Sequence, residues 1–104
     1  MISHLRGRVD SVYSDYVVID VNGVGYTVFV TAGALSNLSM DSDVTLKTSM
    51  VVKEDSVTLY GFKDETERDL FRLLCDVSGI GPRTAVAILS TLSVDTLALA
   101  IAEA

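Results

Sequence analysis

The hydrophobic period of this chain changes near residue 62, and the change limits what the chain can fold into. Residues 1–62 are rich in Val, Ile, Thr and Tyr and alternate with a two-residue period, whereas residues 63–104 are rich in Leu and Ala and repeat every three to four residues. The short period is typical of strands and the longer one of amphipathic helices. We therefore expect two domains, an all-β domain over residues 1–62 and an all-helical domain over residues 63–104.

The first domain is predicted to hold five strands, over residues 2–10, 16–21, 25–30, 44–52 and 56–62. Asn22-Gly23 separates the second strand from the third, and both residues tolerate the positive φ of a tight hairpin turn. Leu35 and Leu38 have helical spacing within residues 32–40, which predicts a short helical turn. Five strands with one helical turn after the third are typical of an OB-fold barrel.

The second domain is predicted to begin with a capped helix. Asp64 can accept from the first free N–H groups, and Glu67 lies three positions further on, as in a capping box. The helix is predicted to end at residues 78–79, and a second helix to run from Pro82 to about residue 90. A third helix is predicted from a cap at Ser93 to Ile101. One apolar stripe is expected on the first helix, formed by Leu70, Phe71, Leu73, Leu74 and Val77.

Charge and composition exclude several classes of protein. The 104 residues carry a net charge of -6, with four basic and seven acidic side chains in each half. Bulk attraction to nucleic acid is therefore excluded, and any such binding must be local. One cysteine and one histidine give neither an internal disulfide nor a metal cluster, so no metal and no cofactor are expected. The start lacks an apolar signal region and no stretch has membrane-spanning length. We therefore expect a cytoplasmic protein that does not associate with a membrane.

Residues 74–89 have the pattern of a helix-hairpin-helix. Gly79 and Gly81 flank Ile80, which can fill the space between two helices, and Ala85 permits their close approach. The free N–H groups of this turn lie at a helix N-terminus, where the helix dipole favours an anion such as a DNA phosphate. Such contacts read no base, so binding would be indifferent to sequence. The candidate phosphate-binding residues are Ser78, Gly79, Ile80, Gly81, Arg83 and Thr84; the alternative is a tight connection with a Schellman-type cap.

Glu54 and Asp55 interrupt an apolar strand and are expected at a hairpin apex. Two adjacent carboxylates could belong to a metal or acid/base site, but no third ligand is near in sequence, and a solvated turn is the usual alternative. Beside a phosphate-binding turn, an acidic tip could repel a DNA backbone and exclude the wrong nucleic-acid shape.

The remaining chemically capable side chains give little support for catalysis. His4 lies in the first predicted strand beside Arg6 and Arg8, where a surface role is expected, with phosphate contact by the arginines left open. Cys75 lies beside an apolar helix face and is expected to be packed. The aromatic side chains could stack bases or pack the barrel, and packing is favoured; they are Tyr13, Tyr16, Tyr26, Phe29, Tyr60 and Phe62.

Several blocks occur together in an order that resembles the RuvA family, the bacterial Holliday junction branch migration subunits. The resemblance runs from residue 1 to about residue 92. The blocks are Leu5-Arg6-Gly7, Val21-Asn22-Gly23-Val24-Gly25-Tyr26, Val51-Val52-Lys53-Glu54-Asp55, Leu59-Tyr60-Gly61-Phe62, Glu67-Arg68, Leu70-Phe71 and Val77-Ser78-Gly79-Ile80-Gly81-Pro82.

The resemblance implies a homotetramer that holds an opened four-way DNA junction on one face. It implies that Glu54 and Asp55 form an acidic pin at the crossover, and that Gly79, Ile80, Gly81, Arg83 and Thr84 grip phosphates of the duplex arms. The implied partners are a RuvB-type hexameric ATPase that drives the DNA, with a RuvC-type resolvase as a further candidate. The family member itself hydrolyses nothing, so a non-catalytic role is expected.

Two departures from the family pattern accompany the resemblance. Ser3-His4 replaces the small-basic pair usual after the first two residues, and the chain stops at Ala104, about where a second helix-hairpin-helix should start. We therefore expect a fragment without the C-terminal domain that engages the ATPase. Two alternatives stay open: a non-catalytic assembly module with an OB barrel scaffold, and a nuclease or glycosylase that would need a catalytic residue such as Asp95.

Overall fold

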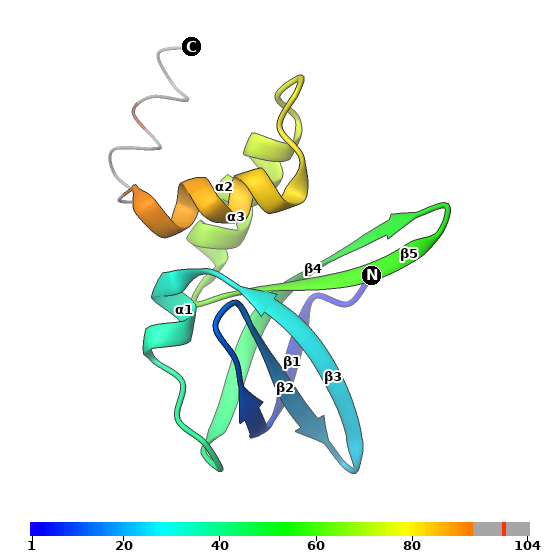
Figure 1. Ribbon diagram of the computed structural model, residues 1–104, viewed down its shortest axis with the longest axis vertical. Coiled ribbons are helices and arrows are strands. Elements are labelled where there is room, and N and C mark those ends of the chain that lie inside the picture. Colours follow the sequence, from blue (N-terminus) through cyan, green and yellow to red (C-terminus); the bar gives the residue numbers. More distant parts are fainter. Residues whose placement is uncertain (93–98, 100–104) are drawn as a thin grey trace.

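The computed structural model describes residues 1–92 and residue 99. Within them the chain forms five strands and three helices (Figure 1). In chain order they are β1 (His4–Val12), β2 (Tyr16–Val21), β3 (Val24–Val30), α1 (Ala32–Ser36), β4 (Asp43–Lys53), β5 (Ser56–Phe62), α2 (Glu65–Cys75) and α3 (Pro82–Thr91).

The strands close into a barrel in the order β1-β2-β3-β5-β4. All neighbouring pairs are antiparallel except β3 and β5, which run parallel. The far end of the β4–β5 hairpin extends away from the rest of the barrel (Figure 1). A five-stranded barrel followed by helices confirms the predicted fold class.

The turn between β2 and β3 has the predicted hairpin geometry. Asn22 and Gly23 have φ of 52° and 90°, and Val21 pairs with Val24 on either side of them. The side chain of Asp20 accepts a hydrogen bond of 2.8 Å from the Gly23 N–H. Both central residues are therefore left-handed, as the type I′ turn requires.

β1 begins and ends two residues later than the sequence pattern predicts. Ile2 and Ser3 each accept a hydrogen bond from Thr48. The Thr48 hydroxyl donates to the Ile2 carbonyl at 2.7 Å, and the Thr48 N–H donates to the Ser3 carbonyl at 2.9 Å. Ile2 and Ser3 are not themselves part of the strand. At the other end a register shift between Val9 and Ser11 lets the strand continue to Val12.

Gly7 is expected to be intolerant of any side chain, because a Cβ there would overlap the backbone carbonyl of Asp20 on β2. A backbone oxygen cannot rotate away, so Gly7→Ala should lower the free energy of unfolding by about 1–3 kcal/mol. Gly25→Ala is the matched control, since its Cβ would meet only a Val18 methyl at 3.2 Å. Urea denaturation measures both variants, and equal stabilities would contradict the close β1–β2 approach.

α2 has the predicted cap, with one difference. The Asp64 side chain accepts a 2.9 Å hydrogen bond from the Glu67 N–H, as expected of an N-cap. The Glu67 carboxylate does not complete a capping box. It is turned into the protein and is only 3% exposed.

The predicted end and apolar stripe of this helix are partly wrong. α2 ends at Cys75 rather than at residues 78–79, so Val77 lies beyond it and is 49% exposed. Leu73 is 48% exposed, because the buried face of α2 is formed by Glu67, Leu70, Phe71 and Leu74, and helical geometry places Leu73 outside that arc.

The helices pack on the outside of the barrel through β5. The core inside the barrel, which includes Val9, Ile19 and Val28, is one buried cluster. Tyr60 and Phe62 of β5 form a second buried cluster with Leu70, Phe71, Leu74, Ala85 and Leu89 of α2 and α3. The full burial of Ala85 agrees with its predicted role in close helix approach. The predicted third helix, from Ser93 to Ile101, lies outside the described residues. No helix among residues 1–92 is long and apolar enough to cross a membrane.

Candidate nucleic-acid interface

The turn between α2 and α3 presents its backbone to open space. Gly79 has a φ of 86°, and a Cβ built at Gly79 or Gly81 would meet nothing within 4 Å. Ser78 is exposed as well. Ile80 is half-buried and packs against the second cluster, and its N–H donates to the Val77 carbonyl at 3.1 Å. Ile80 thus supplies packing, while the neighbouring glycines supply the open backbone.

α3 begins without a side-chain cap. Gly81 is the N-cap, in an extended conformation, and Pro82 occupies the first turn. No side chain of the described residues accepts from the first-turn amides of Arg83 and Thr84. These amides carry the partial positive charge of the helix N-terminus and have no intrahelical partner. They are suited to an anion.

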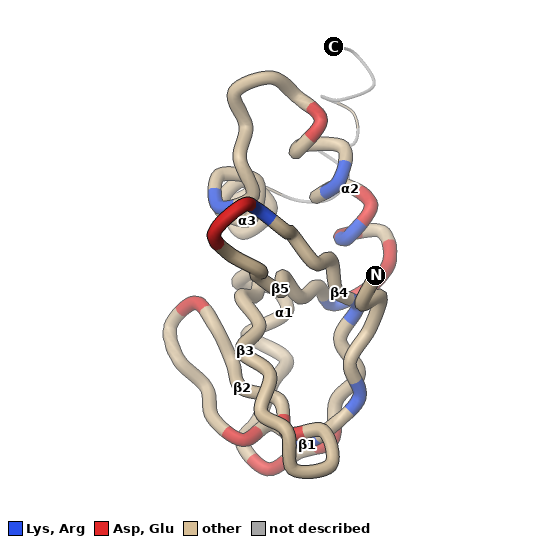
Figure 2. The backbone as a smooth tube through the Cα atoms, turned by 90° about the vertical axis from the view of Figure 1, so that its right-hand side faces the viewer, with Lys and Arg blue, Asp and Glu red and all other residues tan. Residues whose placement is uncertain are grey.

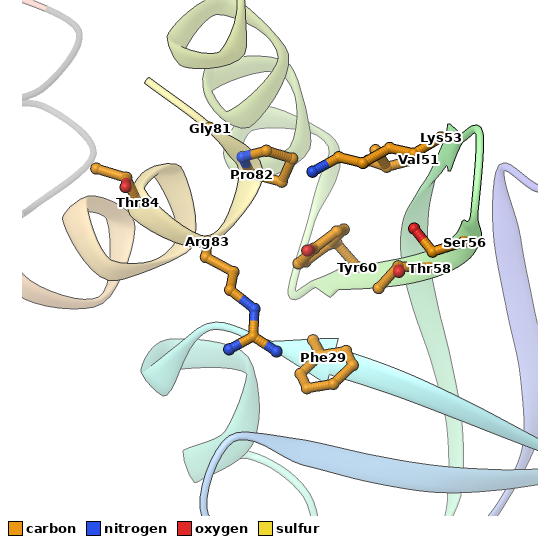
Figure 3. A pocket seen from close by; sticks show the side chains of 10 residues that line it. All are labelled: Phe29, Val51, Lys53, Ser56, Thr58, Tyr60, Gly81, Pro82, Arg83 and Thr84. Carbon is orange, nitrogen blue, oxygen red and sulfur yellow. The ribbon is translucent and has the colours of Figure 1, made fainter. Parts of the chain in front are cut away.

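A cavity of about 450 Å³ lies between the β4–β5 hairpin and the start of α3, and we call it the hairpin–helix cleft. Figure 3 shows Lys53 reaching from the hairpin toward Pro82 and Arg83 reaching from α3 toward Phe29. The cleft therefore receives positive charge from both of its walls. Its polar lining consists of Lys53, Ser56, Thr58, Tyr60, Arg83 and Thr84.

Arg83 is held in the cleft by an aromatic ring. Its guanidinium carbon lies 5.5 Å from the centroid of the Phe29 ring, within the range of a cation–π interaction. Burial raises the pKa of the Tyr60 hydroxyl, although the nearby charge of Arg83 acts in the opposite direction. The Tyr60 hydroxyl therefore stays protonated at neutral pH and can donate a hydrogen bond. Two cations, four hydroxyls and the first amides of a helix are chemically matched to a phosphate.

The acidic pair lies at the tip of the hairpin that forms one wall of the cleft. Lys53 pairs with Ser56 across the turn, so Glu54 and Asp55 are the two apical residues, and both are exposed. This agrees with the predicted apex. Figure 2 shows this acidic turn in red with a blue basic residue beside it, and Figure 1 shows the same turn at the far end of the hairpin, away from α3. The positive charge of Lys53, which lines the cleft, is thus followed in sequence by the negative charge of Glu54.

Sequence reasoning did not find Lys53, Ser56, Thr58 and Tyr60 as part of this site. A signal was available, because alternate residues of a strand face the same side, and Ser56, Thr58 and Tyr60 follow that spacing on β5. Their position opposite α3 depends on how the helices pack on β5, and that packing is not a local property of either segment.

Of the candidate phosphate-binding residues, the cleft is lined by Gly81, Arg83 and Thr84 but not by Ser78, Gly79 or Ile80. The other candidate residues also lie outside it. His4, Arg6 and Arg8 are exposed along β1 and line no part of it. Cys75 is half-buried, and burial together with the Asp76 charge raises the pKa of its thiol, which makes it a weak nucleophile. No group of three or more potential metal ligands occurs in the part of the chain that the structure describes. Asp95 lies outside the described residues.

Most of the aromatic side chains contact one another in a continuous row, whereas Tyr26 packs against the barrel core instead. Tyr13 stacks on Tyr16 with 4.4 Å between centroids, and the row continues through Phe29 and Tyr60 to Phe71 with spacings of 5.6, 6.0 and 5.3 Å. Phe62 also packs against Phe71, at 4.8 Å. These mutual contacts favour the packing interpretation.

Comparison with known proteins assigns the chain to a family. A sequence model of the RuvA N-terminal domain matches residues 1–61, and one described as a SAM-like helix-hairpin-helix tandem matches residues 71–104. Several relatives are named Holliday junction branch migration complex subunit RuvA. The one from Nocardia farcinica (strain IFM 10152) is 47% identical over 99% of this chain and 51% of its own length. The one from Mycobacterium ulcerans (strain Agy99) is 50% identical over 99% of this chain and 52% of its own length. The relative from Thermobifida fusca (strain YX) is 50% identical over 98% of this chain and 50% of its own length.

The chain thus spans about half the length of the curated relatives that it matches. The barrel, the helical hairpin and these matches agree on one assignment, and the chain belongs to the RuvA family.

Proposed function

We propose that this chain binds four-way Holliday junctions, recognising their shape without reading their sequence, and that it does so in branch migration during recombination and DNA repair. One observation carries the proposal. The basic side chains of Lys53 and Arg83 and the uncapped start of α3 line the hairpin–helix cleft, and the acidic pair Glu54 and Asp55 lies at the tip of the hairpin that lines it. The relatives' shared name, Holliday junction branch migration complex subunit RuvA, supports it.

In this proposal the two charged features act in opposite directions. Phosphates of the duplex arms enter the cleft and accept from the Arg83 and Thr84 amides and from the side chains of Lys53 and Arg83. Charge-assisted hydrogen bonds of this kind contribute about 1.5–3 kcal/mol each. The exposed carboxylates of Glu54 and Asp55 repel any backbone that approaches the hairpin tip. A junction with an open centre avoids this repulsion, and a continuous duplex does not.

The proposal extends to the assembly and its partners. Four copies would surround the crossover as a homotetramer, so that four weak phosphate sites act together through avidity. The chain would serve as a non-catalytic subunit in the cytoplasm, with a RuvB-type hexameric ATPase supplying the motion and a RuvC-type resolvase as a candidate partner. Residues 1–62 would act as the barrel domain with the acidic hairpin, and residues 63–104 as the helix-hairpin-helix domain.

Salt dependence of junction binding tests this function. If each copy neutralises about three phosphates, affinity should fall at least about thirtyfold between about 50 and about 200 mM salt, because the counterions released on binding gain less entropy when more salt is present. Fluorescence anisotropy with a labelled four-way junction measures the affinity, and light scattering of the same samples gives the number of copies bound. Salt-independent binding would contradict phosphate recognition, and a bound monomer would contradict the tetramer.

A further inference from the structure

Two adjacent residues, Thr31 and Ala32, each make a hydrogen bond to a different helix of the helical hairpin. These bonds add to the apolar packing on β5 and to a 2.8 Å hydrogen bond from Arg68 Nη1 to the Ser3 carbonyl. Thr31 follows β3 and is fully buried. Its hydroxyl donates a 2.7 Å hydrogen bond to Oε1 of Glu67 on α2. The Ala32 N–H donates a 3.0 Å hydrogen bond to Oγ of Ser90 on α3. We call this pair of contacts the 31–32 joint.

The Glu67 side of the joint is a buried carboxylate held by uncharged donors. Oε1 accepts from the Thr31 hydroxyl and, at 3.2 Å, from the Lys63 N–H. No ion pair to Glu67 occurs among the described residues. Burying a carboxylate costs several kcal/mol unless its hydrogen bonds are well formed. An apolar side chain would fill the same space without that cost. We therefore attribute to Glu67 a role in orienting α2 on the barrel rather than in stabilising the fold.

The Ser90 side of the joint acts on the other helix. Ser90 Oγ donates to the Val86 carbonyl at 2.8 Å while it accepts from Ala32, so the hydroxyl is fixed in orientation. The joint therefore holds α2 in its first turn and α3 in its last turn. Two points of attachment on two helices limit rotation of the helical hairpin about the barrel in a way that one point could not.

The hairpin–helix cleft depends on that orientation because its walls come from both parts of the protein. Lys53 belongs to the barrel hairpin and Arg83 to α3 (Figure 3). The acidic tip lies on the barrel side and the open amides on the helix side. Any rotation between the two parts therefore changes the spacing between the groups that would attract phosphate and those that would repel it.

We infer that the 31–32 joint sets this spacing, which makes Thr31, Glu67 and Ser90 positioning residues for the discrimination of junction from duplex, an inference that rests on the proposed function. None of the three lines the cleft, and they act through the orientation of the helical hairpin formed by α2 and α3.

The first test combines Thr31→Val with Ser90→Ala, which removes both hydroxyls and adds no bulk. Thr31→Ser is the matched control, because it keeps the hydroxyl that donates to Glu67 and that accepts from the Ala34 N–H. Glu67→Leu and Glu67→Gln form a second pair, which tests the same joint if the first variant folds poorly. Leucine removes the acceptor, whereas glutamine retains an amide oxygen in its place.

Two readouts separate positioning from general stability. The first is the distance distribution between spin labels at Val24→Cys on the barrel and Val77→Cys after α2, both exposed sites, in a Cys75→Ser background. The second is the ratio of junction affinity to duplex affinity for the unlabelled chain. The joint predicts a broader label distance and a loss of at least about fivefold in the ratio, the lower end of usual coupling effects.

The conservative variants, Thr31→Ser and Glu67→Gln, should restore both readouts. An unchanged label distance would overturn the inference, and so would a broader distance with an unchanged affinity ratio. If the parent chain shows no preference for junctions, the proposed function fails by itself. The label distances would then still decide whether the joint fixes the helical hairpin, and an unchanged distance would reject it.

Discussion

Reversing the charge of both cleft cations, with Lys53→Glu and Arg83→Glu, is expected to lower affinity for a four-way junction by about a hundredfold or more. Each substitution removes a charge-assisted contact of about 1.5–3 kcal/mol, and each adds a carboxylate facing the phosphate. Arg83→Glu also removes the cation–π contact with Phe29. The measurement is a fluorescence anisotropy titration of a labelled junction at fixed salt.

A matched control separates the cleft from net charge. Lys63→Glu and Arg72→Glu produce the same change in total charge at two exposed positions that do not line the cleft. This control should lower affinity only slightly. Equal losses in the two double variants would show that bulk charge, rather than the cleft, holds the DNA. Junction binding unaffected by the cleft variant would favour the assembly-module alternative instead.

Neutralising the acidic tip, with Glu54→Gln and Asp55→Asn, should act in the opposite direction. The amides keep the shape of the two-residue turn but remove two charges that face any nearby DNA backbone. Two unit charges about 4 Å apart interact by about 1–4 kcal/mol near a protein surface before screening. Duplex affinity should therefore rise by about five- to tenfold, and the preference for junctions should fall by a similar factor.

The control for the tip carries the same charge change elsewhere. Asp10→Asn and Asp69→Asn are exposed substitutions on β1 and α2. Titration of both double variants with a duplex and with a junction of equal arm length gives the four affinities needed. A flat duplex affinity together with a weaker junction affinity would mean that the carboxylates contribute something other than repulsion.

Local signals in the sequence were sufficient where a feature depends on a few neighbouring residues. Asn22-Gly23 predicted the β2–β3 turn because positive φ is a property of those two residues. Asp64 predicted the start of α2 for the same kind of reason, since a cap bonds to an amide three residues away. The apex at Glu54 and Asp55 followed from the interruption of one apolar strand.

Features that depend on contacts distant in sequence could not be predicted in this way. Glu67 fits the capping-box pattern, yet its carboxylate bonds to Thr31, which lies 36 positions earlier in the chain. The tertiary hydrogen bond to Thr31 therefore replaces the local hydrogen bond that the sequence pattern predicts. The cleft shows the same limit, because Lys53 and Arg83 line one cleft only after α2 and α3 pack on β5.

The backbone amides between residues 78 and 84 are the groups whose contact with DNA can be observed most directly. We expect that a titration of the 15N-labelled chain with a four-way junction will shift the amide resonances of Gly79, Gly81, Arg83 and Thr84 most strongly. The Gly23 amide, already bonded to Asp20 in the β2–β3 turn, serves as the internal reference and should not move. Shifts at that turn, with the four named amides unchanged, would show that the junction binds elsewhere on the protein.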